Sequence, residues 1–166
     1  MTFFITFTCY GCHLHGEESG SVSRERNLFG SPLLESDPER VFAEQQRMVE
    51  APYNMDRTRR DAVLTALRER CIERHWILWA AHVRTNHVHL IVTAEARPER
   101  VMNDLKSYAS RCLNRVGLDE PSRKRWARHG STRWLWSRED VLAAIRYVVD
   151  EQGAPMSVFV AAEPAR

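Results

Sequence analysis

Two histidines separated by one apolar residue stand in the segment HVHLIVTA, residues 87–94. On a β-strand, residues i and i+2 point to the same face, so His87 and His89 lie side by side while Val88 and Leu90 face the other way. Two neutral imidazoles on one rigid strand supply two ligands for a divalent metal ion. A pair of partly exposed surface histidines fits the same pattern, so a metal site needs a third component.

A tyrosine further along the chain is the candidate for that component. Tyr108 lies in DLKSYASRCLNR, at the margin of a helical apolar stripe that contains Leu105 and Cys112. There its hydroxyl would lie against the sheet and point toward a metal at the histidine pair. A phenol with an ordinary pKa of about 10 is a poor nucleophile until a base or metal assists, and a metal can also polarise a phosphate under attack. A structural tyrosine at a helix–sheet contact is the alternative, and Tyr147 in the last helix is a competitor with no histidine motif near it in sequence.

The elements that must position these residues follow a recognisable order. Strands are predicted at 3–8, 76–84, 87–94 and 131–137, and helices at 57–75, 98–117 and 137–153. Thr85-Asn86 is the expected hairpin turn, and Ser137-x-x-Asp140 resembles a capping box. The order predicts an α+β, ferredoxin-like split βαβ fold, an antiparallel sheet with helices on one face plus an extra C-terminal helix. We expect one domain over 1–166, with an irregular insertion at about 11–57 that contains one helical stretch at 38–50.

Composition restricts the class of protein. The chain has 166 residues, of which 43% are hydrophobic and 28% charged, values typical of one soluble globular domain. Its apolar runs are too short to cross a bilayer, and the first ten residues lack the basic region and cleavage site of a secretory signal. We therefore expect a cytoplasmic protein that has no membrane partner and keeps its four cysteines as free thiols.

Positive charge is concentrated in one part of the chain. The segment from Arg111 to Arg138 carries eight Lys and Arg against two acidic residues, while the whole chain is only +2. Such a segment suggests a polyanionic partner, although a solvated loop face is equally compatible with the charge alone. The residues expected to contact nucleic acid are Arg111, Arg115, Arg123, Lys124, Arg125, Trp126 and Arg128. Trp134 and Trp136 either stack on unpaired bases or fill the core from the final strand.

The stretch CYGCHLH, residues 9–15, resembles a haem-attachment or zinc site. Haem attachment through C-x-x-C-H requires export, and zinc sites usually need two ligand pairs with a spacer. Cys9 is instead expected to finish the first strand and Gly11 to open a turn, with His13 and His15 beginning the insertion.

The segment RTNHVHLIV, the helix carrying SYASRCLNR, the basic stretch and the final amphipathic helix together resemble the single-tyrosine HUH transposases, specifically the REP-associated tyrosine transposases. The resemblance covers about Arg57 to Gly153, with the first strand added. It implies that His87 and His89 bind Mg²⁺ or Mn²⁺ and that Tyr108 attacks single-stranded DNA bearing stem-loop (REP-like) elements. The expected products are a 5′-phosphotyrosine link and a free 3′-OH, and a second transesterification rejoins strands. The enzyme is expected to be a monomer or a homodimer.

The chain departs from this family at the third metal ligand. The family places a polar ligand about one helical turn after the tyrosine, where this chain has Cys112, a soft ligand poorly suited to Mg²⁺. Asn114 should point elsewhere on the helix, and Asp104, one turn before Tyr108, is a possible substitute. The departure motivates an alternative function, a domesticated nucleic-acid-binding module of the same fold that does not cleave. A metal-dependent hydrolase using the same histidines is a third interpretation.

Overall fold

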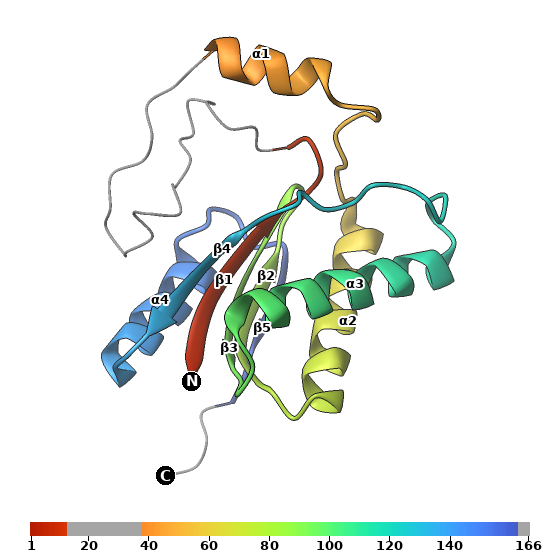
Figure 1. Cartoon of the computed structure of the whole chain (residues 1–166). Helices are drawn as coiled ribbons and strands as arrows, with labels where there is room; N and C mark the ends of the chain where they lie inside the picture. Colours follow the sequence, from red (N-terminus) through yellow and green to blue (C-terminus); the bar gives the residue numbers. More distant parts are fainter. Residues whose placement is uncertain (13–37, 163–166) are drawn as a thin grey trace.

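The computed structural model describes residues 1–12 and 38–162. Its five strands form one antiparallel sheet with helices on both faces (Figure 1). The elements are β1 (Thr2–Thr8), α1 (Pro38–Gln46), α2 (Arg57–Glu73), β2 (Ile77–Val83), β3 (His87–Thr93), α3 (Pro98–Val116), β4 (Ser131–Leu135), α4 (Arg138–Asp150) and β5 (Ser157–Val160). The strand order is β4-β1-β3-β2-β5, with every neighbouring pair antiparallel. The α+β fold class expected from the sequence is confirmed, and β3 lies at the centre of the sheet.

One face of the sheet is covered by α2 and α3. The larger core cluster combines the inward side chains of both helices with alternate residues of the strands, among them Val88, Leu90 and Val92 of β3. Leu105 and Leu113 of α3 are completely buried in this cluster. The apolar half of β3 therefore faces α2 and α3, as its alternation predicts.

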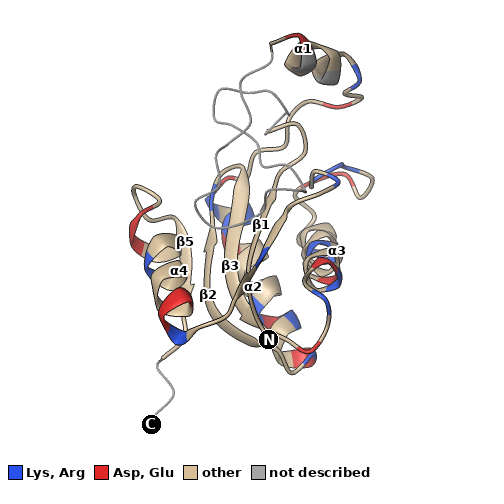
Figure 2. Ribbon diagram, turned by 60° about the vertical axis from the view of Figure 1, so that its left-hand side comes forward, with Lys and Arg blue, Asp and Glu red and all other residues tan. Residues whose placement is uncertain are grey.

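The C-terminal helix α4 covers the opposite face of the sheet (Figures 1 and 2). Its Ala144 and Val148 are buried in a separate cluster with Phe4, Ala80 and Ile91. The expected capping box is present, since Asp140 N–H donates to Ser137 Oγ and the Asp140 carboxylate accepts from Ser137 N–H. The expectation of helices on one face thus holds for α2 and α3, whereas the extra helix forms a layer of its own on the other face.

Strand β5 has no counterpart in the sequence-based prediction. Its four residues follow Gly153 and Pro155, where we expected the last helix to end. Pairing with the outer edge of β2, rather than any long apolar alternation, makes this segment a strand. Such tertiary pairing is not visible in a four-residue stretch of sequence.

The β2–β3 hairpin forms where the sequence predicts it, but for a different reason. Thr85 and Asn86 connect the strands, and neither residue has a positive φ. The turn is held from outside, because Cys9 N–H donates to Asn86 O at 2.7 Å and Met55 N–H donates to Thr85 O at 2.7 Å. The register of β3 is therefore fixed by neighbouring chain segments as well as by the turn.

The first cysteines are structural in the described part of the chain. Cys9 is fully buried and forms an isolated bridge with Trp126, and Cys12 Sγ donates to Tyr53 O at 2.9 Å. Gly11 has a φ of +70°, a left-handed conformation that favours glycine, so the turn expected at this residue is explained by its backbone. His13 and His15 lie outside the described residues. All four cysteines are free thiols, as expected.

Within residues 1–12 and 38–162, none of the helices is long and apolar enough to cross a membrane.

Truncation of Leu105 tests the contact between α3 and the sheet. Leu105→Ala removes a fully buried side chain and leaves a cavity, so we expect the free energy of unfolding in urea to fall by about 2–5 kcal/mol. Leu142→Ala, at an exposed position of α4, is the matched control and should change it by less than about 0.5 kcal/mol. Equal losses in the two variants would contradict this assignment of the core.

Candidate active site

His87 and His89 lie on the face of the sheet that α4 covers. Their ring centroids are 4.7 Å apart, and the rings are inclined by 72°. His89 stands beside Phe4, at 5.6 Å between ring centroids, and Phe4 belongs to the cluster under α4. The side-by-side arrangement predicted for the two histidines is therefore present.

Burial keeps His89 neutral. Only 8% of the residue is exposed, and desolvation, followed by the neighbouring charge of His87, lowers the pKa of His89 to about 3. Its Nδ1 lies 2.7 Å from Thr6 Oγ1, and its Nε2 lies 3.1 Å from Gln152 Oε1. Because the amide oxygen of Gln152 can only accept, Nε2 of His89 carries the proton in this arrangement and Thr6 Oγ1 donates to Nδ1. The Thr6 hydroxyl can also accept, so it can equally bind the other neutral tautomer, which has its lone pair on Nε2.

His87 is oriented by its neighbour in sequence. Its Nδ1 lies 2.7 Å from Asn86 Oδ1, which can only accept, so Nδ1 carries the proton and Nε2 carries the lone pair. This is the tautomer needed for metal ligation through Nε2, with Asn86 as the outer partner that fixes the ring.

Tyr147 and Gln152 reach the same place from the end of α4. The Tyr147 ring centroid lies 6.0 Å from that of His89 and 5.9 Å from that of Phe4. The Gln152 amide nitrogen donates to Tyr147 O at 3.4 Å, which turns Oε1 toward His89. A phenol, an amide oxygen and two imidazoles thus meet between α4 and β3.

His82 is buried next to this group, but both of its ring nitrogens form hydrogen bonds that stabilise the fold. Its Nδ1 lies 2.9 Å from Val148 O and therefore donates, so Nε2 is the nitrogen that accepts Met156 N–H at 3.1 Å. Burial lowers the pKa of His82. Both nitrogens are occupied, and the ring ties the end of α4 to the start of β5 instead of serving as a ligand.

The donor set around His89 fits a divalent cation only if Gln152 is included. Among the described residues, no three His, Cys, Asp or Glu side chains gather in a way that could hold a metal ion. His87, His89 and the Gln152 carbonyl oxygen supply two nitrogen donors and one oxygen donor, all neutral. Imidazole and amide oxygen are both ligands for cations such as Mn²⁺.

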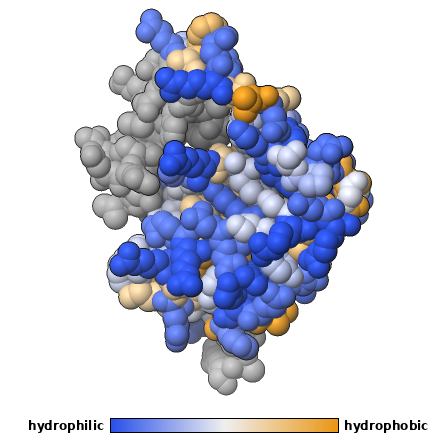
Figure 3. Space-filling view, turned by 45° about the vertical axis from the view of Figure 1, so that its right-hand side comes forward, coloured by the Kyte–Doolittle hydropathy of each residue, from blue (hydrophilic) through white to orange (hydrophobic). Residues whose placement is uncertain are grey.

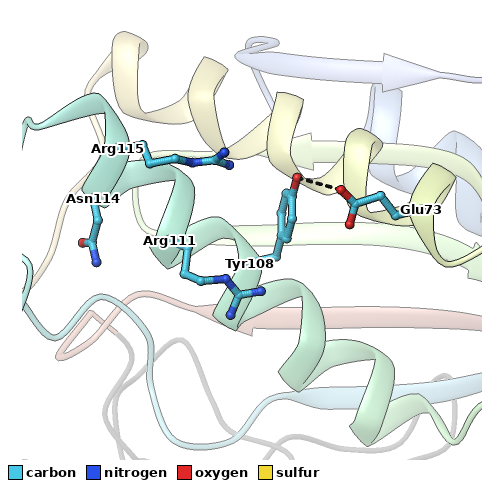
Figure 4. Close-up of a pocket in the computed structure, with 5 residues that line it drawn as sticks. All are labelled: Glu73, Tyr108, Arg111, Asn114 and Arg115. Atoms are coloured by element: carbon cyan, nitrogen blue, oxygen red, sulfur yellow. Dashed lines mark hydrogen bonds between the residues drawn. The ribbon is translucent and has the colours of Figure 1, made fainter.

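Tyr108 does not lie near the histidines. It packs against the core cluster under α2 and α3, on the opposite face of the sheet, and its hydroxyl lies 3.3 Å from both Glu69 and Glu73 of α2. It lines a hollow of about 500 Å³ with Glu73, Arg111, Asn114 and Arg115 (Figure 4). Partial burial, and then the charge of Glu73, raise the pKa of Tyr108, which disfavours the phenolate. The expectation that its hydroxyl points toward the histidine pair is corrected, because the sheet separates them.

Cys112 and Asp104, the residues of α3 considered as third ligands, also lie away from the histidine pair, on the other face of the sheet. Cys112 is a buried residue of α3 and accepts from Arg115 at 2.8 Å. Asp104 is paired with Arg70 at 2.6 Å and with Arg74 at 2.7 Å. Gln152 was missed. One signal in the sequence was available, since the family's polar ligand about one turn after the tyrosine, counted from Tyr147, leads to Glu151 and its neighbour Gln152.

Comparison with protein families decides the classification of the chain. The family described as "Transposase IS200 like" matches residues 52–139, which is more than half of the sequence. The chain belongs to the IS200-like transposase family. The match contains His87 and His89 but ends before Tyr147 and Gln152.

Two solved structures are similar to this family member. The REP-associated tyrosine transposase bound to a REP hairpin is 13% identical, with a TM-score of 0.49, over 90% of this chain and 65% of that chain. A protein from Deinococcus radiodurans R1 assigned to the transposases is 14% identical, with a TM-score of 0.45, over 93% of this chain and 92% of that one. The chain thus spans just under two thirds of the REP-associated transposase, and both likenesses concern the fold alone. None of the curated proteins matches the chain.

The residues predicted to bind nucleic acid divide into an inward and an outward group. Arg125 is 3% exposed and bound to Asp119, and Arg123 is bound to Glu50 and to Ala51 O. Trp126 donates from Nε1 to Lys106 O and Ser110 Oγ and packs edge-on against Phe7. These three hold the loop after α3 in place. The exposed members are Arg111, Arg115, Lys124 and Arg128.

This exposed group lies on α3 and on the loop after it (Figure 2). The loop passes the end of the sheet where β3 begins, because Ala127 N–H donates to Thr8 O at 3.0 Å and Thr8 pairs with His87. The surface on the side of α2 and α3 is mainly hydrophilic (Figure 3). Four of the seven residues predicted to bind nucleic acid are therefore exposed, and the loop that carries two of them lies at the end of the sheet that carries His87.

Trp134 and Trp136 are exposed at the edge strand β4. Their rings are stacked, with centroids 5.4 Å apart and an angle of 10° between the planes. Trp134 is 42% exposed and Trp136 is 75% exposed, so the alternative that they fill the core is wrong. The edge of Trp134 still contacts Phe3 in the core.

The burial of His89 predicts a loss of stability in acid. Its folded pKa of about 3 lies below the ordinary value of 6.5, so between these values the unfolded chain holds a proton that the folded protein excludes. We expect the free energy of unfolding, measured in urea with EDTA present, to fall by about 2 kcal/mol from pH 7 to pH 5 through this residue. His89→Gln should flatten this dependence, and an unchanged slope in the variant would contradict the assignment.

Proposed function

We propose that this transposase cleaves and rejoins single-stranded DNA with Tyr147 as the nucleophile, at the site formed by His87, His89 and Gln152. The observation that carries the proposal is the meeting of a tyrosine from α4 with two histidines and an amide oxygen on one face of the sheet. Tyr147 takes the role that the sequence suggested for Tyr108, since only Tyr147 lies on the histidine face.

His87 and His89 through Nε2 and Gln152 through Oε1 are the residues that would hold Mg²⁺ or Mn²⁺. A bound cation of this kind polarises a phosphoryl oxygen and neutralises charge that develops on it. Outer partners orient the donors, because Asn86 and Thr6 bind the Nδ1 atoms of the two rings and Tyr147 O orients Gln152. Ligation by His89 would require its proton to move from Nε2 to Nδ1, where it would donate to the Thr6 hydroxyl.

In the proposed step the Tyr147 oxygen attacks the phosphorus of one phosphodiester. The new P–O(Tyr147) bond replaces the P–O3′ bond, the phenolic proton passes to solvent, and the departing 3′ oxygen takes up a proton. The products are a 5′-phosphotyrosine and a free 3′-OH, and attack by a 3′-OH on the phosphotyrosine reverses the exchange and joins strands. No oxidant or nucleotide is required, since the number of ester bonds is conserved.

The proposed substrate is single-stranded DNA that carries a stem-loop. Exposed Arg111, Arg115, Lys124 and Arg128 supply charge for the phosphate backbone, a contribution that weakens with salt. Stacked Trp134 and Trp136 offer a flat aromatic surface to unpaired bases, each worth about 1–3 kcal/mol. The loop that carries Lys124 and Arg128 runs beside Thr8, which pairs with His87, so a strand bound to this loop would lie near the proposed site.

A binding module that does not cleave is the alternative function. Its motivation was the soft Cys112 at the expected third-ligand position, and the nearness of Gln152 to His89 removes that motivation. Salt-sensitive DNA binding that never yields a covalent product would favour the module over the enzyme.

The nucleophile is tested by trapping the covalent intermediate. The full chain is incubated with Mn²⁺ and a labelled pool of single-stranded oligonucleotides that contain a stem-loop and randomised flanks, and the adduct is resolved on a denaturing gel. We expect an adduct with the wild type and with Tyr108→Phe, and none with Tyr147→Phe, because the phenylalanine lacks the attacking oxygen. The two substitutions are chemically identical and lie on opposite faces of the sheet, so each controls for the other.

An adduct that persists in Tyr147→Phe and disappears in Tyr108→Phe would overturn the assignment of the nucleophile. Absence of an adduct from folded wild-type protein, with DNA binding retained, would support the binding module.

The third ligand is tested by metal binding without DNA. Mn²⁺ binding is followed by electron paramagnetic resonance of the free ion. We expect Gln152→Ala to weaken this binding by about tenfold or more, because an oxygen donor is lost. Cys112→Ser is the control and should leave the Mn²⁺ affinity unchanged, since Cys112 lies in the core cluster on the other face of the sheet. The opposite pattern would return the third ligand to α3.

A further inference from the structure

Arg84 is the basic residue opposite His87 in the β2–β3 hairpin. Its N–H donates to His87 O at 2.9 Å, and in the same ladder His82 is opposite His89. Residues opposite one another in an antiparallel pair share a face of the sheet. Arg84 therefore projects to the face of α4, together with the two histidines of the candidate site.

The guanidinium of Arg84 is directed to the segment that follows Gln152. Nη1 donates to Ala154 O at 3.1 Å, and Nη2 would lie 3.9 Å from a Cβ placed on Gly153. A second contact of Nη1, with His82 Nε2, is long at 3.4 Å, and that nitrogen already accepts Met156 N–H. Among the described residues, one short hydrogen bond, to Ala154 O, holds the Arg84 guanidinium beside the site.

Its charge is not neutralised within the described part of the chain. Other arginines form close ion pairs, such as Arg59 with Asp119 and Arg123 with Glu50, whereas Arg84 has no carboxylate partner among residues 1–12 and 38–162. The donors around it, two histidines and an amide, are neutral. A guanidinium beside a neutral ligand set attracts an anion to that set.

We propose that Arg84 binds the non-bridging oxygens of the phosphate that Tyr147 attacks, and so holds that phosphate at the site. The proposal rests on the proposed function and adds a phosphate-binding residue to it. A planar guanidinium donates two parallel hydrogen bonds to phosphate oxygens. Negative charge on those oxygens grows as the Tyr147 oxygen approaches, so donors already in place stabilise the transition state more than the bound substrate.

The test compares a charged and a neutral linkage at the same position. Adducts trapped from the randomised stem-loop pool are sequenced to locate the cleaved linkage, and one oligonucleotide is then made with a phosphodiester or an uncharged methylphosphonate there. Single-turnover rate constants of adduct formation are measured for the wild type, Arg84→Gln and Arg84→Lys. Arg57→Gln, an equal loss of charge on α2 at a residue whose side chain is 89% exposed, is the matched control.

On the phosphodiester we expect Arg84→Gln to be slower by about 100-fold or more, Arg84→Lys to be intermediate, and Arg57→Gln to equal the wild type. On the methylphosphonate, wild type and Arg84→Gln should differ by less than about fivefold, because the charge that Arg84 recognises is gone. Mn²⁺ affinity and the thermal midpoint of Arg84→Gln should match the wild type.

Wild-type rates for Arg84→Gln on the phosphodiester would overturn the proposal. An equal loss on both linkages would also overturn it, because it would indicate that Arg84 only supports the hairpin. These results differ from failure of the proposed function, in which the wild type itself forms no adduct and the Arg84 proposal is lost with it.

Discussion

The structure depends on the alternation of side chains along β3. Val88, Leu90 and Val92 face α2 and α3, while His87, His89 and Ile91 face α4. A strand at the centre of the sheet has both faces covered, so each polar side chain on it needs a partner. Thr6 and Gln152 supply those partners to His89. The chemistry is therefore placed by the same alternation that forms the core, because residues of opposite parity cannot exchange faces.

The elements were predictable from sequence to a large degree, whereas the layer that each helix joins was not. Apolar periodicity located α2, α3 and α4, and turn residues located the hairpin. Tyr108 and Tyr147 both stand at the margin of an apolar stripe, so periodicity alone does not choose between them. The tertiary structure distinguishes the two tyrosines, because the helices that pack on Val88 and Leu90 are separated from His87 by the sheet. Gln152 falls within the helix predicted at 137–153, but helical periodicity does not single it out as a ligand, and α4 ends at Asp150.

The basic segment shows a second limit of reasoning from sequence. Charge density correctly indicated an exposed cationic surface on α3 and its following loop. It did not indicate that Arg123 is bound to Glu50 and Arg125 to Asp119, because those carboxylates are identified only by tertiary contact. The tryptophans show the same limit, because sequence alone does not tell which of them is exposed. Trp126 donates to Lys106 O and is anchored inward, whereas Trp136, just after β4, is exposed.

The candidate site is carried by the smaller of the two core clusters. α4 contributes Ala144 and Val148 to a group of five buried residues, whereas α2 and α3 share a much larger one. Apolar burial alone holds α4 less firmly, and its position is what brings Tyr147 and Gln152 to β3. His82 adds hydrogen bonds that hold the C-terminal end of α4. It binds Val148 O and Met156 N–H and so joins α4, β2 and the start of β5. A neutral imidazole suits this place, since it donates and accepts at once inside a buried region. His82, which is not one of the proposed ligands, thus helps to hold Tyr147, the proposed nucleophile, beside the two histidines.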